Sequence, residues 1–296
     1  MRIGLVDVDG HNFPNLALMK LSAWHKLRGD TVEFADPAAG RYDKVYLSKV
    51  FTFSKDCTDR YDCEVVRAGT GYRNYATVLS EEIEHICPDY SLYGVGEAYG
   101  FLTRGCVNCC PWCVVPRKEG AIRAHADIGE FLDGRKRALL LDNNVLASEW
   151  GLAQIEKIVR MGIRVDFNQG LDARRIVRTP EIAALLARVR WIRYLRMAYD
   201  SRAMQDDVHK AIELLKRCGM PARKLFFYVL VRDDIEDALE RIRELKALGC
   251  QPFAQPYRDF EHDLKPSREQ WRLAYWCNCK PLFYSADYEE YRKSQT

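Results

Sequence analysis

The sequence predicts a mixed α/β fold, with a partial (βα)6 TIM-like barrel preceded by a small Rossmann-like α/β domain. Short apolar runs alternate with helical patterns over residues 98–260, the order that builds a parallel sheet with right-handed crossovers. Six such runs are present, too few for a closed barrel of eight strands. A separate strand and helix pattern occupies residues 1–50. We therefore expect two α/β units in this chain.

The N-terminal unit is expected to alternate strands with one helix. Apolar runs predict strands over Arg2–Val8, Thr31–Phe34 and Lys44–Val50. Apolar side chains at helical spacing predict a helix over Leu16–Leu27. Residues 51–97 are rich in aromatic and turn residues but show little periodicity, so we expect them to form a connector packed on the core.

The barrel core, residues 98–260, is expected to contribute six parallel strands. These are Tyr99–Arg104, Arg137–Leu141, Ile163–Phe167, Trp191–Tyr199, Lys224–Val231 and Gln251–Gln255. The remaining residues, 261–296, are expected to form a C-terminal helix and a tail.

Helices are expected between these strands. Apolar positions at helical spacing predict helices over Trp150–Met161 and Met204–Cys218. Thr179 is the expected N-cap of another helix. Asp233 is expected to open the clearest helix, which ends near Gly249.

Composition restricts the class of protein. Apolar residues make up 48% of the chain, which is ample material for a packed core. The excess of basic over acidic residues is only +3, so nucleic acid is neither required nor excluded as a partner. No apolar run approaches the roughly 18 residues of a membrane span, and the first residues are typical of a strand rather than a secretory signal. We expect a cytoplasmic protein without membrane contact.

The chain has eleven cysteines, and four of them fall within eight residues: Cys106, Cys109, Cys110 and Cys113. In a reducing compartment these are not expected to form disulfides. Cys106, Cys110 and Cys113 have the spacing C-x3-C-x2-C. Three thiolates on a tight loop can hold three irons of a [4Fe–4S] cube and leave the fourth iron open to a small chelating ligand.

Other metal and redox sites explain this cluster less well. Structural zinc requires two C-x2-C pairs separated by a dozen or more residues, whereas here the pairs abut. The ferredoxin run C-x2-C-x2-C fails because Trp112 stands where a cysteine is needed. A redox C-x-x-C pair accounts for only half of the cluster. A non-catalytic Fe–S or zinc-binding module remains an alternative.

The segments Tyr99–Cys106, Cys110–Cys113 and Val115–Gly120 together resemble the cluster-binding segment of radical S-adenosylmethionine (radical SAM) enzymes. They are most similar to the branch with cobalamin-binding domains and methylthiotransferases, here with a shortened N-terminal domain. The resemblance implies that Cys106, Cys110 and Cys113 ligate the [4Fe–4S] cluster. It also implies that Trp112 lies near the adenine of S-adenosylmethionine and that Cys109 is not a ligand.

The resemblance further implies the reaction. The methionyl amine and carboxylate of S-adenosyl-L-methionine chelate the open iron. One electron, supplied by a donor such as flavodoxin or ferredoxin, then cleaves the C–S bond. The products are methionine and a 5′-deoxyadenosyl radical, which abstracts hydrogen from a substrate that the sequence does not identify.

Polar residues after the strands are expected to line the cofactor site, because a βα barrel carries its chemistry at the C-terminal ends of its strands. The candidates are Asp142, Asn143, Gln169, Asp172 and Arg174 and, after the fourth strand, Asp200. Asp142 or Asn143 has an oxygen that can accept a hydrogen bond from the methionyl ammonium, with a plain turn as the alternative. Arg174 suits the methionyl carboxylate, and Gln169 and Asp172 suit ribose or substrate. A plain salt bridge between Asp172 and Arg174 is the other interpretation.

Cobalamin is a less favoured cofactor. His11 lies in a segment similar to the cobalamin-ligating pattern D-x-H-x-x-G, but Pro14 stands at the position of the glycine. The N-terminal unit is also too short for a complete cobalamin-binding domain. Cobalamin-dependent methyl transfer is therefore the alternative function. Tyr257–Asp259, after the sixth strand, is expected to help close the site.

Overall fold

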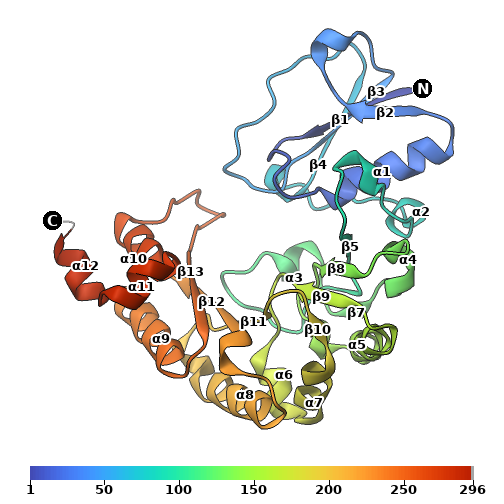
Figure 1. Ribbon diagram of the computed structural model, residues 1–296. Helices are drawn as coiled ribbons and strands as arrows, with labels where there is room; N and C mark the ends of the chain where they lie inside the picture. Colours follow the sequence, from blue (N-terminus) through green and yellow to red (C-terminus); the bar gives the residue numbers. More distant parts are fainter. Residues whose placement is uncertain (295–296) are drawn as a thin grey trace.

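The computed structural model describes residues 1–294 and has a mixed α/β fold with parallel sheets. The strands are β1 (Arg2–Asp7), β2 (Thr31–Phe34), β3 (Lys44–Ser48), β4 (Glu64–Ala68), β5 (Ala98–Gly100), β6 (Thr103–Arg104), β7 (Arg123–Ala124), β8 (Arg137–Leu140), β9 (Arg164–Phe167), β10 (Arg190–Trp191), β11 (Leu195–Ala198), β12 (Leu225–Val231) and β13 (Gln251–Pro256). Figure 1 shows an N-terminal unit above a larger unit whose strands are flanked by helices.

Twelve α-helices connect and cover these strands within the described residues. They are α1 (Leu16–Leu27), α2 (Glu81–Glu84), α3 (Val115–Lys118), α4 (Ile128–Leu132), α5 (Glu149–Met161), α6 (Ala173–Arg178), α7 (Glu181–Arg188), α8 (Gln205–Arg217), α9 (Ile235–Ala247), α10 (Arg268–Asn278), α11 (Lys280–Ser285) and α12 (Tyr288–Ser294). Short 3₁₀ turns are η1 (Pro37–Ala39), η2 (Thr70–Tyr72), η3 (Tyr90–Leu92), η4 (Val145–Ala147), η5 (Arg202–Met204) and η6 (Ala222–Lys224). Over residues 1–294, no helix combines the length and apolar character needed to cross a membrane.

The N-terminal unit is built on a parallel sheet in the order β2-β1-β3-β4. Ile3 and Leu5 of β1 pack against Leu18 and Leu21 of α1, and this apolar contact holds the helix on the sheet. The helix α1 and the strand β2 have the bounds that the sequence predicts. The sheet extends beyond residues 1–50, because β4, inside the segment expected to be a connector, pairs with β3.

The larger unit contains two parallel sheets, in the orders β10-β9-β8-β5 and β11-β12-β13. They meet where Leu171, after β9, forms a parallel bridge with Met197 of β11. The Leu171 N–H donates to the Arg196 carbonyl at 2.8 Å across this junction. The sequence predicts six strands in one barrel. The structure has two parallel sheets joined by one bridge and does not show a closed TIM-like barrel.

Two of the expected strands are wrong because each one is interrupted. Trp191–Tyr199 divides into β10 and β11, which belong to different sheets, and residues 192–194 form a bend between them. Tyr99–Arg104 divides into β5 and β6. The Asp142 carboxylate accepts the N–H groups of Leu102 and Thr103, so the chain turns away from β8 and β6 pairs with β7 instead.

Two expected helix starts are each displaced by one residue. Thr179 is not the N-cap of α7, because it ends the preceding helix α6, and the N-cap is Pro180. The cap of α9 is Asp234 rather than Asp233, and its carboxylate accepts the Asp237 N–H at 2.9 Å. The C-terminal segment holds three helices rather than one helix and a tail, since it buries Trp276, Phe283 and Tyr288.

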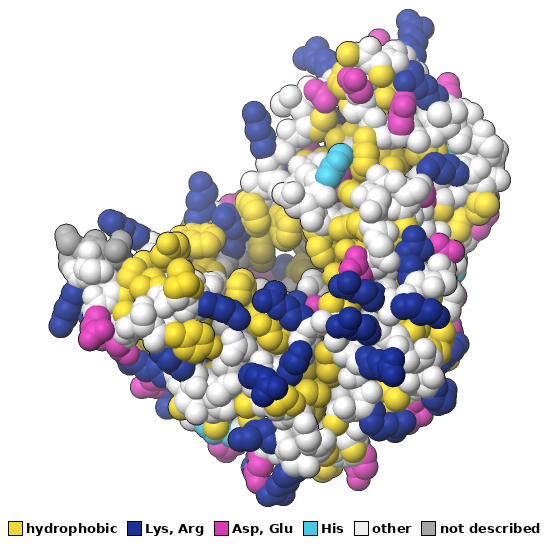
Figure 2. Space-filling model, viewed as in Figure 1, with side chains coloured by type: hydrophobic (Ala, Val, Ile, Leu, Met, Phe, Trp, Pro, Cys, Tyr) yellow, Lys and Arg dark blue, Asp and Glu magenta, His cyan; other side chains and the backbone are white. Residues whose placement is uncertain are grey.

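A hollow separates the N-terminal unit from the C-terminal helices, and Figure 2 shows hydrophobic side chains on its wall. The segment after β13 reaches across to the N-terminal unit. Arg73 donates to the Phe260 carbonyl at 2.6 Å and pairs with Asp263, and Arg258 lies 4.3 Å from the ring centre of Phe53. These contacts join the two units.

Candidate functional site

The cysteine loop, residues 105–114, is closed at its base by the antiparallel pair of β6 and β7. Gly105 opens the loop with a φ of +82°, and a Cβ at this position would collide with the Ala121 carbonyl. The Cys106 N–H donates to the Gly120 carbonyl at 3.2 Å, and the Cys113 N–H donates to the Cys110 carbonyl at 3.0 Å. The loop is therefore held at its start and folded into a tight turn near its end.

The three thiols of the C-x3-C-x2-C pattern differ from their neighbour. Cys106, Cys110 and Cys113 are partly buried, whereas Cys109 is exposed. Burial raises the pKa of the Cys110 and Cys113 thiols. The charge of Cys106 raises the pKa of both further, and that of Cys113 also raises the pKa of Cys110. The three thiols thus influence one another and are less exposed than Cys109.

The thiols do not surround a single ion. Throughout residues 1–294, no three His, Cys, Asp or Glu side chains converge in a geometry that would hold one metal ion. Each thiolate of a cube binds its own iron, so a cluster spreads its ligands more widely than one zinc ion does.

Asp172 is the centre of a polar network beside the loop. It lies after β9, is 8% exposed and caps α6 by accepting the Arg174 N–H. The Arg174 guanidinium binds both carboxylate oxygens, at 2.7 and 3.0 Å. Burial alone raises the pKa of Asp172, but hydrogen bonds from Arg174 and Asn108 outweigh it and lower the pKa below its ordinary value. The salt bridge that the sequence left as an alternative is present.

Two asparagine amides bind the same Asp172 oxygen. Asn108, inside the cysteine loop, donates from Nδ2 at 2.9 Å, and Asn144, after β8, donates at 3.2 Å. Asn144 Nδ2 also lies 3.5 Å from the Cys106 sulfur. The other amide atom, Asn144 Oδ1, is buried and has no hydrogen-bond partner among the described residues. Neither asparagine was a candidate from the sequence: of the run Asp142–Asn144 after the second strand only the first two residues were chosen, and Asn108 lies within the loop itself.

Asp142 is engaged by the backbone next to the loop. It is 2% exposed, and its carboxylate accepts from the Leu102 and Thr103 N–H groups and from the Thr103 hydroxyl. Burial raises the pKa of Asp142 to about 6 despite these hydrogen bonds. The structure therefore gives Asp142 a role in shaping the entry to the loop.

Glu119 connects the loop to the end of β8, and the sequence did not single it out. One of its oxygens accepts the Gly105 N–H at 3.0 Å and the Asn143 amide at 2.9 Å. The Arg104 guanidinium lies 3.5 Å from its other oxygen, and the Glu119 side chain is only 5% exposed. Asn143 thus contacts the loop through Glu119.

Trp112 and Asp200 each have arginine side chains as neighbours. The guanidinium of Arg232, just after β12, lies 4.7 Å from the centre of the Trp112 ring. Burial raises the pKa of Asp200 to about 6, with Arg241 and Arg174 opposing the rise. The charge of Asp200 contributes to the raised pKa of the Cys110 and Cys113 thiols. Gln169 is exposed and has no hydrogen bond to this network.

The remaining candidates, His11 and Tyr257–Asp259, contact residues outside the cysteine loop. The His11 ring stacks on Phe34 at 4.1 Å and meets the Tyr93 ring edge-on. Tyr257–Asp259 begins the segment that reaches the N-terminal unit. That segment also meets the helix after the loop, where Arg117 and Glu261 form a 2.6 Å ion pair.

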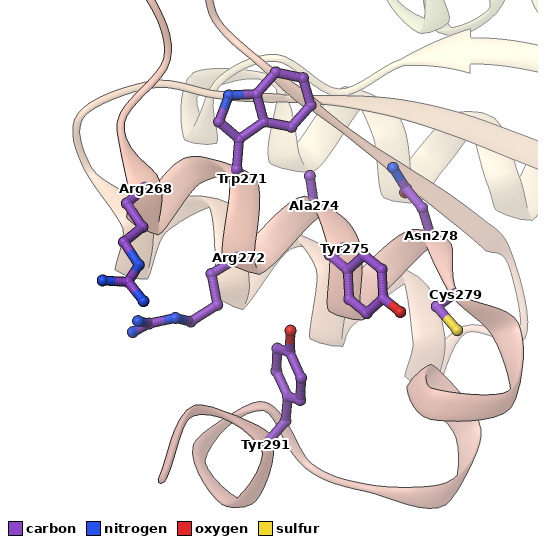
Figure 3. A pocket seen from close by; sticks show the side chains of 8 residues that line it. All are labelled: Arg268, Trp271, Arg272, Ala274, Tyr275, Asn278, Cys279 and Tyr291. Carbon is purple, nitrogen blue, oxygen red and sulfur yellow. The ribbon is translucent and has the colours of Figure 1, made fainter. Parts of the chain in front are cut away.

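A second hollow lies away from these residues, on α10 and α12 (Figure 3). This α10–α12 groove encloses about 670 Å³. It is lined by Arg268, Trp271, Arg272, Ala274, Tyr275, Asn278, Cys279 and Tyr291. Trp271 and Tyr275 are more than half exposed, and Tyr275 stacks on Tyr291 with ring centres 6.3 Å apart.

Comparison with known proteins adds no family to this description. No protein-family model matches the chain, and a search of curated proteins also finds no match.

Proposed function

We propose that this protein is a radical SAM enzyme that abstracts hydrogen from a substrate of still undefined class. One observation carries the proposal: three partly buried thiols on one tight loop lie beside a polar network drawn from the ends of parallel strands. In α/β folds, ligands bind outside the carboxyl ends of such strands. The sequential order of β5, β8, β9, β11, β12 and β13 supports a partial barrel as the scaffold.

The donor set fits an iron–sulfur cluster and its chelating ligand. Cys106, Cys110 and Cys113 would hold the [4Fe–4S] cluster, because thiolates are its usual ligands. The buried Asn144 Oδ1, which lacks a donor, fits a bound ammonium group. When bound, the cluster supplies the electron that cleaves S-adenosylmethionine to methionine and a 5′-deoxyadenosyl radical.

The protein's own residues orient the ligands and limit access by water. Asp172 fixes the Asn108 and Asn144 amides, and Glu119 holds the start of the loop by accepting the Gly105 N–H. Arg174, with its remaining N–H groups, suits the carboxylate of the cofactor. Trp112, stacked under Arg232, offers an aromatic surface beside the last ligand cysteine.

The alternative of a structural zinc site is less well supported. A structural zinc site needs two cysteine pairs separated by a dozen or more residues, whereas the two pairs of this loop abut. The three thiols and the open polar side of the loop suit a cluster with one exchangeable iron better.

Anaerobic reconstitution with iron and sulfide tests the proposal. The reconstituted protein should show the spectrum of a [4Fe–4S] cluster and, with dithionite and S-adenosylmethionine, should release 5′-deoxyadenosine. An intact cluster that yields no 5′-deoxyadenosine under strong reduction would contradict the enzyme proposal. A protein that binds zinc and no cluster would support the alternative of a metal-binding module.

The same preparation tests for cobalamin. Protein made with added hydroxocobalamin should lose the corrin spectrum on desalting, because Pro14 replaces the glycine of the cobalamin-ligating pattern that includes His11. Corrin that stays bound would make cobalamin-dependent methyl transfer the preferred reaction.

A further inference from the structure

We infer that Asn144, held by Asp172, tunes the reduction potential of the cluster through a hydrogen bond to the sulfur of Cys106; this inference rests on the proposed function. Asn144 Nδ2 lies 3.5 Å from that sulfur and 3.2 Å from Asp172 Oδ2. Asn144 is 2% exposed, so bulk water does not compete for its amide group.

The orientation of the Asn144 amide follows from its partner. An ionised carboxylate only accepts hydrogen bonds, so the amide must turn its nitrogen toward Asp172. The bidentate contact with Arg174 keeps Asp172 ionised. The reversed amide would place Oδ1 against a carboxylate oxygen. One N–H therefore binds Asp172, and the second faces Cys106.

A donor at this position favours the reduced cluster. Reduction adds negative charge to the cluster and its sulfur ligands, and hydrogen bonds to the sulfurs stabilise that charge. The Asn108 N–H also donates to Cys106, at 3.4 Å, and the Val115 N–H donates to Cys113, at 3.5 Å. Both of these donors belong to the backbone. Within residues 1–294, Asn144 is the side chain that donates to one of the three thiols, so a substitution can remove its contribution.

The midpoint potential of the cluster, measured without S-adenosylmethionine, is the decisive readout. Wild-type protein is compared with Asn144→Leu, which keeps the volume but removes the donor, and with Asn144→Ala, which cannot clash. Asn143→Ala is the matched control, since Asn143 follows the same strand and binds Glu119 rather than sulfur. Redox titration followed by electron paramagnetic resonance gives each potential. Iron and sulfide per chain are measured on the same samples.

Both Asn144 variants should keep iron and sulfide and shift the midpoint potential to more negative values, while Asn143→Ala should match wild type. An unchanged potential in the Asn144 variants, with the cluster retained, would overturn the inference and leave the proposed function standing. An equal shift in Asn143→Ala would also overturn it, as would loss of iron from both Asn144 variants. Wild-type protein that forms no [4Fe–4S] cluster would instead overturn the proposed function.

Discussion

The cysteine loop and the α10–α12 groove are both bordered by aromatic and arginine side chains, but they hold these side chains differently. At the loop, buried polar groups from separate strand ends bind one another, as Asp172 binds Asn108 and Asn144. In the groove, the lining comes from α10, the residue after it and α12. Its largest rings, Trp271 and Tyr275, are mostly exposed.

This difference teaches that a large hollow and a cluster of interacting polar groups lie in different parts of this protein, and our proposal rests on the polar cluster. The groove encloses a large volume, and its Arg272 is paired locally with Glu269 at 2.9 Å. The loop gathers carboxylates with shifted pKa values, Asp142, Asp172 and Asp200, together with three thiols. Shifted carboxylates held by specific partners are typical of functional sites.

The largest expected effect separates the ligand cysteines from the spectator. Replacing Cys106, Cys110 or Cys113 by Ala should remove most of the iron and abolish formation of 5′-deoxyadenosine, because one iron loses its protein ligand. Cys109→Ala should leave both largely intact. The measurement is iron per chain and 5′-deoxyadenosine yield across the four variants. Loss of iron in Cys109→Ala with retention in Cys110→Ala would show that the spacing assignment is wrong.

The second effect contrasts two tryptophans of α10. Trp276 is 1% exposed, and its indole donates to the Ala286 carbonyl at 3.1 Å, whereas Trp271 is 54% exposed in the groove. Trp276→Ala should lower the free energy of unfolding by about 3–5 kcal/mol. Trp271→Ala should change it by less than about 0.5 kcal/mol. Urea unfolding measures both, and similar losses in the two variants would mean that the groove is part of the packed core.

The third effect is a pH dependence of stability that arises from Asp142, just before the cysteine loop in space. Burial raises the pKa of Asp142 from 3.8 to about 6, so the ionised carboxylate is disfavoured in the folded state. The contribution of Asp142 to the free energy of unfolding is greatest below pH 3.8, where the group is protonated in both states. It should fall by up to about 3 kcal/mol as the pH rises through 6.

The control for this prediction is Asp142→Asn, which is neutral at every pH. The difference in unfolding free energy between wild type and Asp142→Asn isolates the titration of this carboxyl group. A difference that stays flat, or that grows between pH 4 and 6, would contradict a raised pKa at Asp142.

The smallest expected effect concerns binding of S-adenosylmethionine at the loop. Trp112→Ala removes the ring that lies under Arg232 and should weaken binding by up to about tenfold with iron unchanged. Equilibrium binding to the reconstituted protein is the measurement. Trp271→Ala, in the groove, is the matched control and should bind as tightly as wild type. Equal weakening in both variants would remove the distinction between the two regions.

Local patterns in the sequence were sufficient for much of the secondary structure. The helix α1 and the strand β2 have the bounds predicted from apolar spacing, and the strands β8 and β12 differ from theirs by one residue. The interrupted strands were not predictable in this way. The break after β10 depends on which sheet each half joins, and that pairing is a long-range contact.

The candidate site shows the same limit. The spacing of Cys106, Cys110 and Cys113 is local, so the sequence predicts these residues as one set. It also offered the Asp172–Arg174 pair as an alternative, because two residues so close in the chain can meet within one helix start. Asn108 and Asn144 lie far from Asp172 in the chain, and no spacing signals their contact with it.

The sequence by itself determined the mixed α/β class, the cysteine loop and the apolar faces of the helices, since each depends on residues close together in the chain. Only the tertiary structure decided which polar groups meet. It buried Asp142 against β6, joined Glu119 to Asn143 and set Asn144 against Cys106. The physical reason is that a buried polar group must find a hydrogen-bond partner, and here the partner comes from whichever strand end the fold brings beside it.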